Sequence, residues 1–224
     1  MGAPAVRRTR AKRGSGDLLR EEIVVAAKRL LAEAERADDV PMRAVAEAVG
    51  VTTPSIYLHF ADKQELLAAV VADVFRELDD AMTEAAVAET SPMARLRAYG
   101  LAYVRFALDH REHYRLAMLE PCPTPNIEVD EVLHSSAFSH MEATVRECVD
   151  AGLFQGDPLA ITFEMWAAAH GVAALMIAKP YLPFGEAEDF ADRALCAAAI
   201  GHVVGPIVGD EPGAIVQWLA RNGR

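Results

Sequence analysis

Apolar residues recur at three- and four-residue intervals along most of the chain, and no segment alternates apolar and polar residues as a half-buried strand would. The spacing begins at Asp17 and predicts later helices at about 92–109, 111–119, 128–151, 158–179, 187–204 and 213–221. A chain of 224 residues, of which 52% are hydrophobic, can bury a substantial core. The sequence therefore predicts an all-α protein.

The segment 42–60 predicts a helix-turn-helix, because Gly50 separates two short helical patterns at 42–49 and 53–60. Its apolar side chains pack inward, namely Val45, Val49, Val51, Ile56 and Phe60. Hydroxyls and backbone N–H groups at a helix start bind phosphate oxygens, and a threonine methyl or a leucine can meet a thymine methyl. We therefore expect DNA contacts from the outward-facing residues Thr52, Thr53, Pro54, Ser55, Tyr57, Leu58 and His59.

A longer helix is expected after this segment, because Asp62 and Glu65 have the spacing of a capping box and the apolar pattern continues to about Ala88. Lys63 lies in its first turn, where the helix dipole disfavours a cation. A bound phosphate would reverse that interaction, whereas the alternative is an ordinary solvated lysine. We expect Lys63 to contact the DNA backbone.

Charge is distributed unevenly along the chain. Residues 1–60 hold ten Lys/Arg and eight Asp/Glu, which gives 10 − 8 = +2, and residues 61–224 hold twelve and twenty-five, which gives 12 − 25 = −13. A basic module on an acidic body favours one orientation toward a polyanion. Residues 1–16 form a basic arm that is expected to be disordered; Arg10 and Arg13 either reach into a minor groove or belong to a solubilising tail.

Several other classes of protein find no support in the sequence. The three cysteines are scattered, which indicates reduced thiols rather than a zinc site or a disulfide framework. His110 and His113 lack partners for a metal site, no G-x-S-x-G turn is present, and no catalytic constellation or cofactor site is evident. The absence of a signal peptide, together with the shortness of the apolar stretch 166–178, predicts a soluble cytoplasmic protein without membrane contact.

The spacing of the helix-turn-helix segment resembles the N-terminal signature of the tetracycline-repressor (TetR) family of transcriptional regulators. The matching residues are Arg43, Val45, Ala46, Gly50, Val51, Thr52, Ile56, Tyr57, His59, Phe60, Lys63 and Leu66. One position departs from the pattern, because Pro41 stands where family members commonly have a Thr or Ser that caps the helix and contacts phosphate. Arg43 is the expected replacement for that contact.

The resemblance implies a homodimeric repressor that binds a palindromic DNA operator and is released by a small apolar or amphipathic effector. It also implies a three-helix DNA-binding domain at 17–62, preceded by the arm at 1–16, and a helical ligand-binding and dimerisation domain at 63–224. Two alternatives remain: a DNA-binding protein that is architectural or activating and needs no ligand, and, less favoured, an enzyme that handles small molecules.

The C-terminal part resembles a TetR subgroup named for a Trp-x-x-x-His-Gly motif, which Trp166, His170 and Gly171 carry here. Trp166 and His170 share a helix face, either as part of a pocket wall or as core residues. The expected ligand contacts are large or adaptable side chains on inward helix stripes, namely Tyr103, Phe106, Tyr114, Met118, Phe138, Met141, Trp166, His170 and Met176. Dimerisation is expected from the two late helices, whose small residues allow close packing with a partner.

Overall fold

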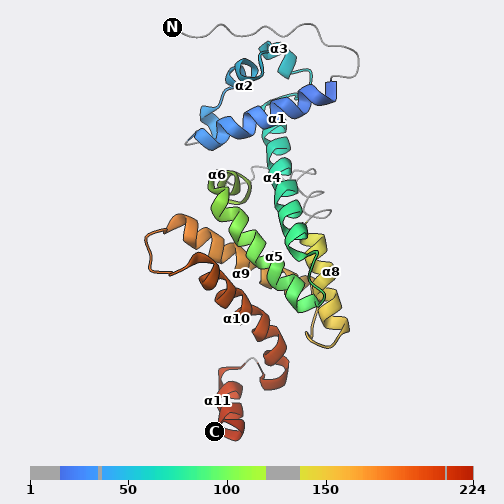
Figure 1. The fold of residues 1–224 in the computed structure, drawn as a ribbon, viewed down its shortest axis with the longest axis vertical. Coiled ribbons are helices and arrows are strands. Elements are labelled where there is room, and N and C mark those ends of the chain that lie inside the picture. Colours follow the sequence, from blue (N-terminus) through green and yellow to red (C-terminus); the bar gives the residue numbers. More distant parts are fainter. Residues whose placement is uncertain (1–15, 35–36, 120–136, 210, 224) are drawn as a thin grey trace. The chain divides into compact units, whose positions relative to one another are not determined.

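The protein is all-α throughout the part that the structure, a computed structural model, describes: residues 16–34, 37–119, 137–209 and 211–223. The N-terminal elements are α1 (Gly16–Glu33), η1 (Ala37–Asp39), α2 (Met42–Val49), α3 (Thr53–Ile56) and α4 (Lys63–Ala86). Next come α5 (Pro92–Asp109), α6 (Arg111–Tyr114) and the π-helical turn η2 (Arg115–Leu119). The chain continues with α8 (Ala137–Asp150), α9 (Pro158–Ala178), α10 (Ala187–Val208) and α11 (Pro212–Asn222) (Figure 1). The predicted fold class is confirmed.

The chain divides into two units. The first contains Met1–Glu77 and His110–Leu133, and the second contains Leu78–Asp109 and His134–Arg224. Helix α4 therefore begins in the first unit and ends in the second, since the division falls after Glu77.

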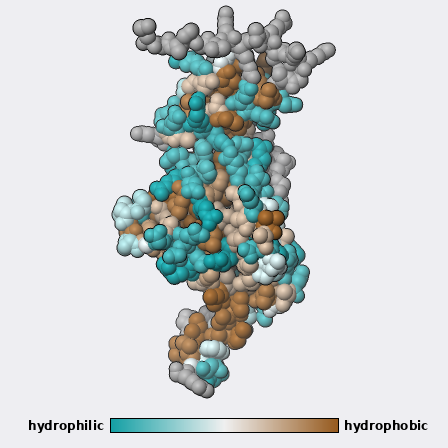
Figure 2. Space-filling model, viewed as in Figure 1, coloured by the Kyte–Doolittle hydropathy of each residue, from teal (hydrophilic) through white to brown (hydrophobic). Residues whose placement is uncertain are grey.

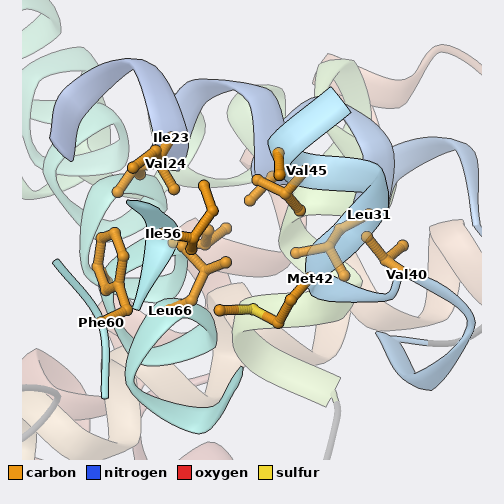
Figure 3. Packing of buried hydrophobic residues seen from close by; sticks show 13 residues of the cluster. Ile23, Val24, Leu31, Val40, Met42, Val45, Ile56, Phe60 and Leu66 are labelled. Atoms are coloured by element: carbon orange, nitrogen blue, oxygen red, sulfur yellow. The ribbon is translucent and has the colours of Figure 1, made fainter. Parts of the chain in front are cut away.

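A hydrophobic cluster holds α1, α2, α3 and the start of α4 together in the first unit. Ile23 and Val24 come from α1, Val45 from α2 and Ile56 from α3 (Figure 3). Ile56 and Phe60 are fully buried, as the helix-turn-helix pattern requires. The cluster fixes the orientation of α3 on the two helices that precede it.

Local backbone signals set the ends of the short helices. Gly50 ends α2 in the left-handed region at φ 76°, ψ 31°, and its N–H and that of Val51 donate to carbonyls of the last turn of α2. The side chain of Asp62 accepts a 2.9 Å hydrogen bond from the Glu65 N–H, and Glu65 in turn accepts one from the Ala61 N–H at 2.5 Å. The expected reciprocal capping interaction is present, with Ala61 as the backbone donor to Glu65.

Several predicted elements differ from the observed ones. The predicted helix 111–119 is α-helical only to Tyr114 and continues as the π-helical η2, and the first residues of the predicted helix 128–151 lie outside the described part of the chain. The predicted helix 53–60 is α-helical only from Thr53 to Ile56. Residues 57–59 then form a turn in which the N–H groups of His59 and Phe60 both donate to the Ile56 carbonyl. Helix α10 extends past 204 to Val208 with Pro206 inside it. A proline this close to a helix end removes a single backbone hydrogen bond, so the helix continues through it.

In the second unit, α5 packs against α8, α9 and α10, and α9 also packs against α8 and α10 (Figure 1). By length and composition alone, both α9 and α10 could cross a membrane. Complete α9 has 21 residues, whereas the apolar stretch 166–178 considered in the sequence analysis has 13. The buried residues of α9, which include Ile161, Thr162 and Met165, identify it as a core helix of this unit.

Candidate functional site

The predicted DNA-facing residues form one surface around α3. Leu58 is 84% exposed and Tyr57 49% exposed, although their neighbours Ile56 and Phe60 have no exposed surface. Thr52 and Pro54 are also exposed, and Thr53, Ser55 and His59 are half-buried. The buried residues beneath them keep this leucine and this tyrosine exposed to solvent. They form an apolar surface with one hydroxyl, which can contact thymine methyl groups in the major groove.

Thr52 precedes α3 in an extended conformation, and its hydroxyl lies 2.8 Å from that of Ser55 rather than on a backbone N–H group. Each hydroxyl keeps capacity for a further hydrogen bond, since a hydroxyl has one donor and two acceptor sites. The pair can therefore be oriented before a phosphate or a base arrives.

The two cations predicted to contact the DNA backbone each lie near an exposed carboxylate. Lys63 is the first residue of α4, and its Nζ lies 3.9 Å from an Oδ atom of Asp38 in η1. Arg43 is 80% exposed with its Nε 3.4 Å from Glu47. The Arg43–Glu47 pair is exposed on both sides, whereas the Lys63 side chain is 28% exposed and its partner Asp38 is 78% exposed. Ion pairs with an exposed partner contribute little to stability, so a phosphate can compete with either carboxylate.

Pro41 precedes α2 in an extended conformation and makes no side-chain capping hydrogen bond. Arg10 and Arg13 of the basic arm lie outside the described residues.

Arg20 is a DNA-facing candidate that the sequence analysis missed. Its guanidinium carbon lies 4.9 Å from the centroid of the Phe60 ring, and its side chain is exposed. The cation–π contact holds a positive charge beside residues 52–59, the predicted DNA-facing segment. No sequence pattern indicated this contact, because 40 residues separate Arg20 from Phe60 and only the fold brings them together.

In the second unit, three of the predicted ligand contacts meet at the hydroxyl of Tyr103, and a fourth, Phe138, lies against one of them. This oxygen accepts a 3.2 Å hydrogen bond from Trp166 Nε1 and lies 3.3 Å from His170 Nδ1. Burial lowers the pKa of His170, which favours the neutral imidazole and allows Nδ1 to accept from Tyr103. Phe138 lies edge-on to Trp166, with ring centroids 6.0 Å apart.

Phe163 belongs to the same group, although the sequence analysis omitted it. Its ring centroid lies 4.9 Å from that of Phe138 and 6.3 Å from that of Trp166, and the side chain is 50% exposed. Its position three residues before Trp166 could have indicated this, because residues three apart on a helix lie on the same face. We call Tyr103, Phe138, Phe163, Trp166 and His170 the aromatic cluster; it combines ring faces with neutral hydrogen-bonding groups.

The remaining predicted ligand contacts are distributed over both units. Phe106, Met141 and Met176 belong to the buried core of the second unit. Tyr114, which is 1% exposed, and the half-buried Met118 belong to the first unit.

Among the described residues, no three His, Cys, Asp or Glu side chains come close enough together to hold a metal ion. The rings of His110 and His113 stack with centroids 6.1 Å apart.

Two family models match the chain. Residues 23–70 match "Bacterial regulatory proteins, tetR family", and residues 96–198 match "Tetracyclin repressor-like, C-terminal domain". No curated protein matches the chain. The Trp-His-Gly subgroup stays a prediction.

Solved structures share the fold. A protein of unknown function from Rhodococcus sp. RHA1 is 29% identical, with a TM-score of 0.72 over 83% of this chain and 95% of that chain. RolR in complex with resorcinol is 18% identical, with a TM-score of 0.63 over 86% and 90% of the two chains. The fatty acid degradation regulator FadR from Bacillus halodurans is 16% identical, with a TM-score of 0.68 over 85% and 97%. The helix-turn-helix, its outward-facing residues and the two family matches together show that the chain belongs to the TetR family of bacterial transcriptional regulators.

Proposed function

We propose that the protein is a cytoplasmic repressor, and not an enzyme, that binds a palindromic operator as a homodimer and leaves it when a small molecule binds. The observation that carries DNA binding is the surface around α3, where Tyr57 and Leu58 are exposed beside the fully buried Ile56 and Phe60. We assign DNA binding to residues 17–62 and effector binding with dimerisation to residues 63–224.

Dimerisation is supported by the free faces of α9 and α10. Gly171 on α9 and Gly201 on α10 are exposed, and a Cβ atom added to either would meet nothing within 4 Å. Ala167 and Ala197 are exposed one turn earlier on each helix. Small residues on two neighbouring helices allow the same two helices of a second copy to approach closely and form a four-helix interface.

The experiment that tests this function is a selection of bound duplexes from a randomised pool, followed by measurement of binding stoichiometry. A two-fold symmetric protein should select inverted half-sites centred about 34–36 Å apart or at a multiple of that spacing, with two chains per site. Tight binding by one chain, or equal affinity for all duplexes, would contradict the proposal and favour an architectural role.

Lys63→Ala should weaken binding to the operator and to a scrambled duplex by the same factor, because a phosphate contact carries no sequence information. The slope of log K against log salt should fall by about 1. Asp38→Asn should act in the opposite direction and tighten binding to both duplexes, since it removes the carboxylate that lies 3.9 Å from Lys63. Fluorescence anisotropy titrations at several salt concentrations measure both effects.

Arg146→Ala is the matched control for charge, because Arg146 is an exposed, ion-paired cation on α8 in the second unit. Its removal should leave the salt slope unchanged. An unchanged slope in Lys63→Ala as well would show that Lys63 does not contact DNA.

The effector is proposed to bind at the aromatic cluster, where ring faces and neutral polar groups suit a small apolar or amphipathic molecule. RolR, a relative in fold, was solved with resorcinol, so simple phenols are suitable first probes. A ligand releases DNA only through its different affinities for the bound and released conformations.

Trp166→Ala should reduce release of the operator by an active phenol while operator affinity stays within a few-fold of the wild type. It removes one ring of the cluster and the hydrogen bond to Tyr103. Tyr103→Phe is the smaller matched change, since it removes only the shared hydroxyl. Loss of operator binding together with helicity in Trp166→Ala would instead identify Trp166 as a core residue.

A further inference from the structure

The ring of His113 on α6 is buried in the first unit without a hydrogen-bond partner. Its two nitrogens, Nδ1 and Nε2, are both covered, and neither has a partner among the described residues. A neutral imidazole carries one donor and one acceptor, and an imidazolium carries two donors. Buried polar groups are nearly always paired, so one that is not is a candidate for a functional role.

The segment that holds His113 covers one side of the first unit. Helix α6 packs against α1, and Leu116 of η2 packs against the hydrophobic cluster that includes residues of α1, α2 and α3. The residue after His113, Tyr114, is 1% exposed. On the outer side Arg111 and Glu112 are exposed, and Figure 2 shows mostly hydrophilic residues where Figure 1 places α6. Solvent therefore lies close to a ring whose nitrogens are covered.

Charged and titratable groups face this ring from α1, from α4 and from the residue before α6. Lys28 comes from α1, and hydrogen bonds of 2.6 Å to Asp73 and Glu77 of α4 hold its ammonium in place. His110 stacks on His113 with ring centroids 6.1 Å apart. Burial has the largest effect and lowers the pKa of His113. The charges of Lys28 and His110 lower that pKa further, and Glu77 and the Lys28 backbone raise it without reversing the shift.

The packing of α6 against α1 therefore depends on pH. A detached segment takes up a proton near the ordinary histidine pKa of 6.5, whereas the packed segment takes it up only at lower pH. The contact is thus fully stable above pH 6.5 and weakens as pH falls from 6.5 through the lowered pKa of His113. Protonation would also add a second positive charge to the one that Lys28 already carries at this contact.

We propose that His113 is a proton sensor: when its ring is protonated, α6 and η2 separate from α1 and the protein releases the operator. The link to DNA is the hydrophobic cluster, because Leu116 packs against it and Ile56 of α3 belongs to it. Separation removes Leu116 from the cluster and loosens the support of α3. This release rests on the proposed operator binding and requires no ligand at the aromatic cluster.

The first measurement is the operator Kd at constant ionic strength between pH 7.5 and pH 5.5. His113→Phe keeps a ring at the position but cannot take up a proton. The Kd of the wild type divided by that of His113→Phe should rise at least about threefold as pH falls, since linkage to a proton changes the affinity. The ratio removes effects common to both proteins, such as protonation of His59 on the DNA-facing surface. His113→Gln, which also stays neutral, should behave as His113→Phe does.

His140→Gln is the matched control, because His140 is exposed and pairs with Asp79 in the second unit. It should keep the pH dependence of the wild type. A ratio that does not change with pH for either His113 variant would overturn the proton sensor and leave operator binding standing. A wild type that binds no duplex at any pH would contradict the proposed function and the sensor together.

The second measurement is hydrogen exchange of the α6 and η2 amides at the same pH values, expressed as protection relative to an unstructured chain. The Tyr114 N–H donates a 2.8 Å hydrogen bond to the His110 carbonyl, so it reports directly on α6. Its protection should fall between pH 7.5 and pH 5.5 in the wild type and stay constant in His113→Phe. The amides around the buried Val172 and Ala173 of α9 should stay protected in both proteins. Loss of α6 protection in both proteins, or in neither, would overturn the proposal.

Discussion

Replacing Phe60 with alanine is expected to lower the free energy of unfolding of the first unit by about 3–5 kcal/mol, the usual cost of deleting a buried aromatic side chain. Phe60 has no exposed surface and lies in the cluster with Ile56 and Leu66 (Figure 3). Its loss also removes the ring beneath the Arg20 guanidinium. Because whole domains are stable by only about 5–15 kcal/mol, α3 should lose much of its ordered population.

Hydrogen exchange across α1, α2 and α3 measures this effect locally. Tryptophan fluorescence cannot, because Trp166 and Trp218 both belong to the second unit. Leu58→Ala is the control two residues away: Leu58 is 84% exposed, so stability should change by no more than about 0.5 kcal/mol while DNA binding weakens. If Phe60→Ala lowers the free energy of unfolding by less than about 1 kcal/mol, the hydrophobic cluster does not hold residues 52–59 in place.

The helix-turn-helix segment of the first unit could be predicted from the sequence because its determinants are local, whereas the inclusion of residues 110–133 in that unit was not predicted. The apolar spacing, Gly50 and the Asp62–Glu65 pair each act within a few residues and agree with one another. The same agreement identified the residues that stay outside the core, such as Tyr57 and Leu58.

Features that depend on distant residues could not be predicted. Arg20 lies over Phe60, and Asp38 lies beside Lys63, only because the fold brings them together. The extension of α10 through Pro206 was missed because the local rule that proline ends a helix is weak in the last turn. The predicted ligand contacts were chosen by residue type, which cannot separate the aromatic cluster from core residues such as Met176.

A second large effect is expected at Lys28, a buried lysine on α1 that the apolar pattern did not single out. Its Nζ lies 2.6 Å from a carboxylate oxygen of Asp73 and 2.6 Å from one of Glu77, both on α4. Arg76 also contacts Asp73 at 2.6 Å. These contacts link α1 to the part of α4 that belongs to the first unit.

The network shifts the pKa of both main partners. Burial would lower the pKa of Lys28, but the hydrogen bonds and charges of Asp73 and Glu77 outweigh it and raise the pKa above the usual 10.5. Burial would likewise raise the pKa of Asp73, yet the hydrogen bonds from Lys28 and Arg76 lower it below 3.8. The stabilisation is therefore fully present between pH 3.8 and pH 10.5, the ordinary pKa values of the two groups. It is lost as pH falls through the lowered pKa of Asp73 or rises through the raised pKa of Lys28.

Lys28→Met should lower the free energy of unfolding at pH 7 by about 2–3 kcal/mol, because Asp73 stays partly buried with Arg76 as its remaining cation. The difference from the wild type should shrink below about pH 4, where a protonated Asp73 needs no counter-charge. His113 adds a second loss of stability at acid pH in both proteins, because burial lowers its pKa. The charge of Lys28 lowers that pKa further in the wild type alone. Denaturant unfolding at pH 3, 5, 7 and 9 separates these contributions, and Lys28→Met/Asp73→Asn should recover part of the loss at pH 7. A deficit in Lys28→Met that does not change with pH would show that Lys28 acts by packing its side chain and not by its charge.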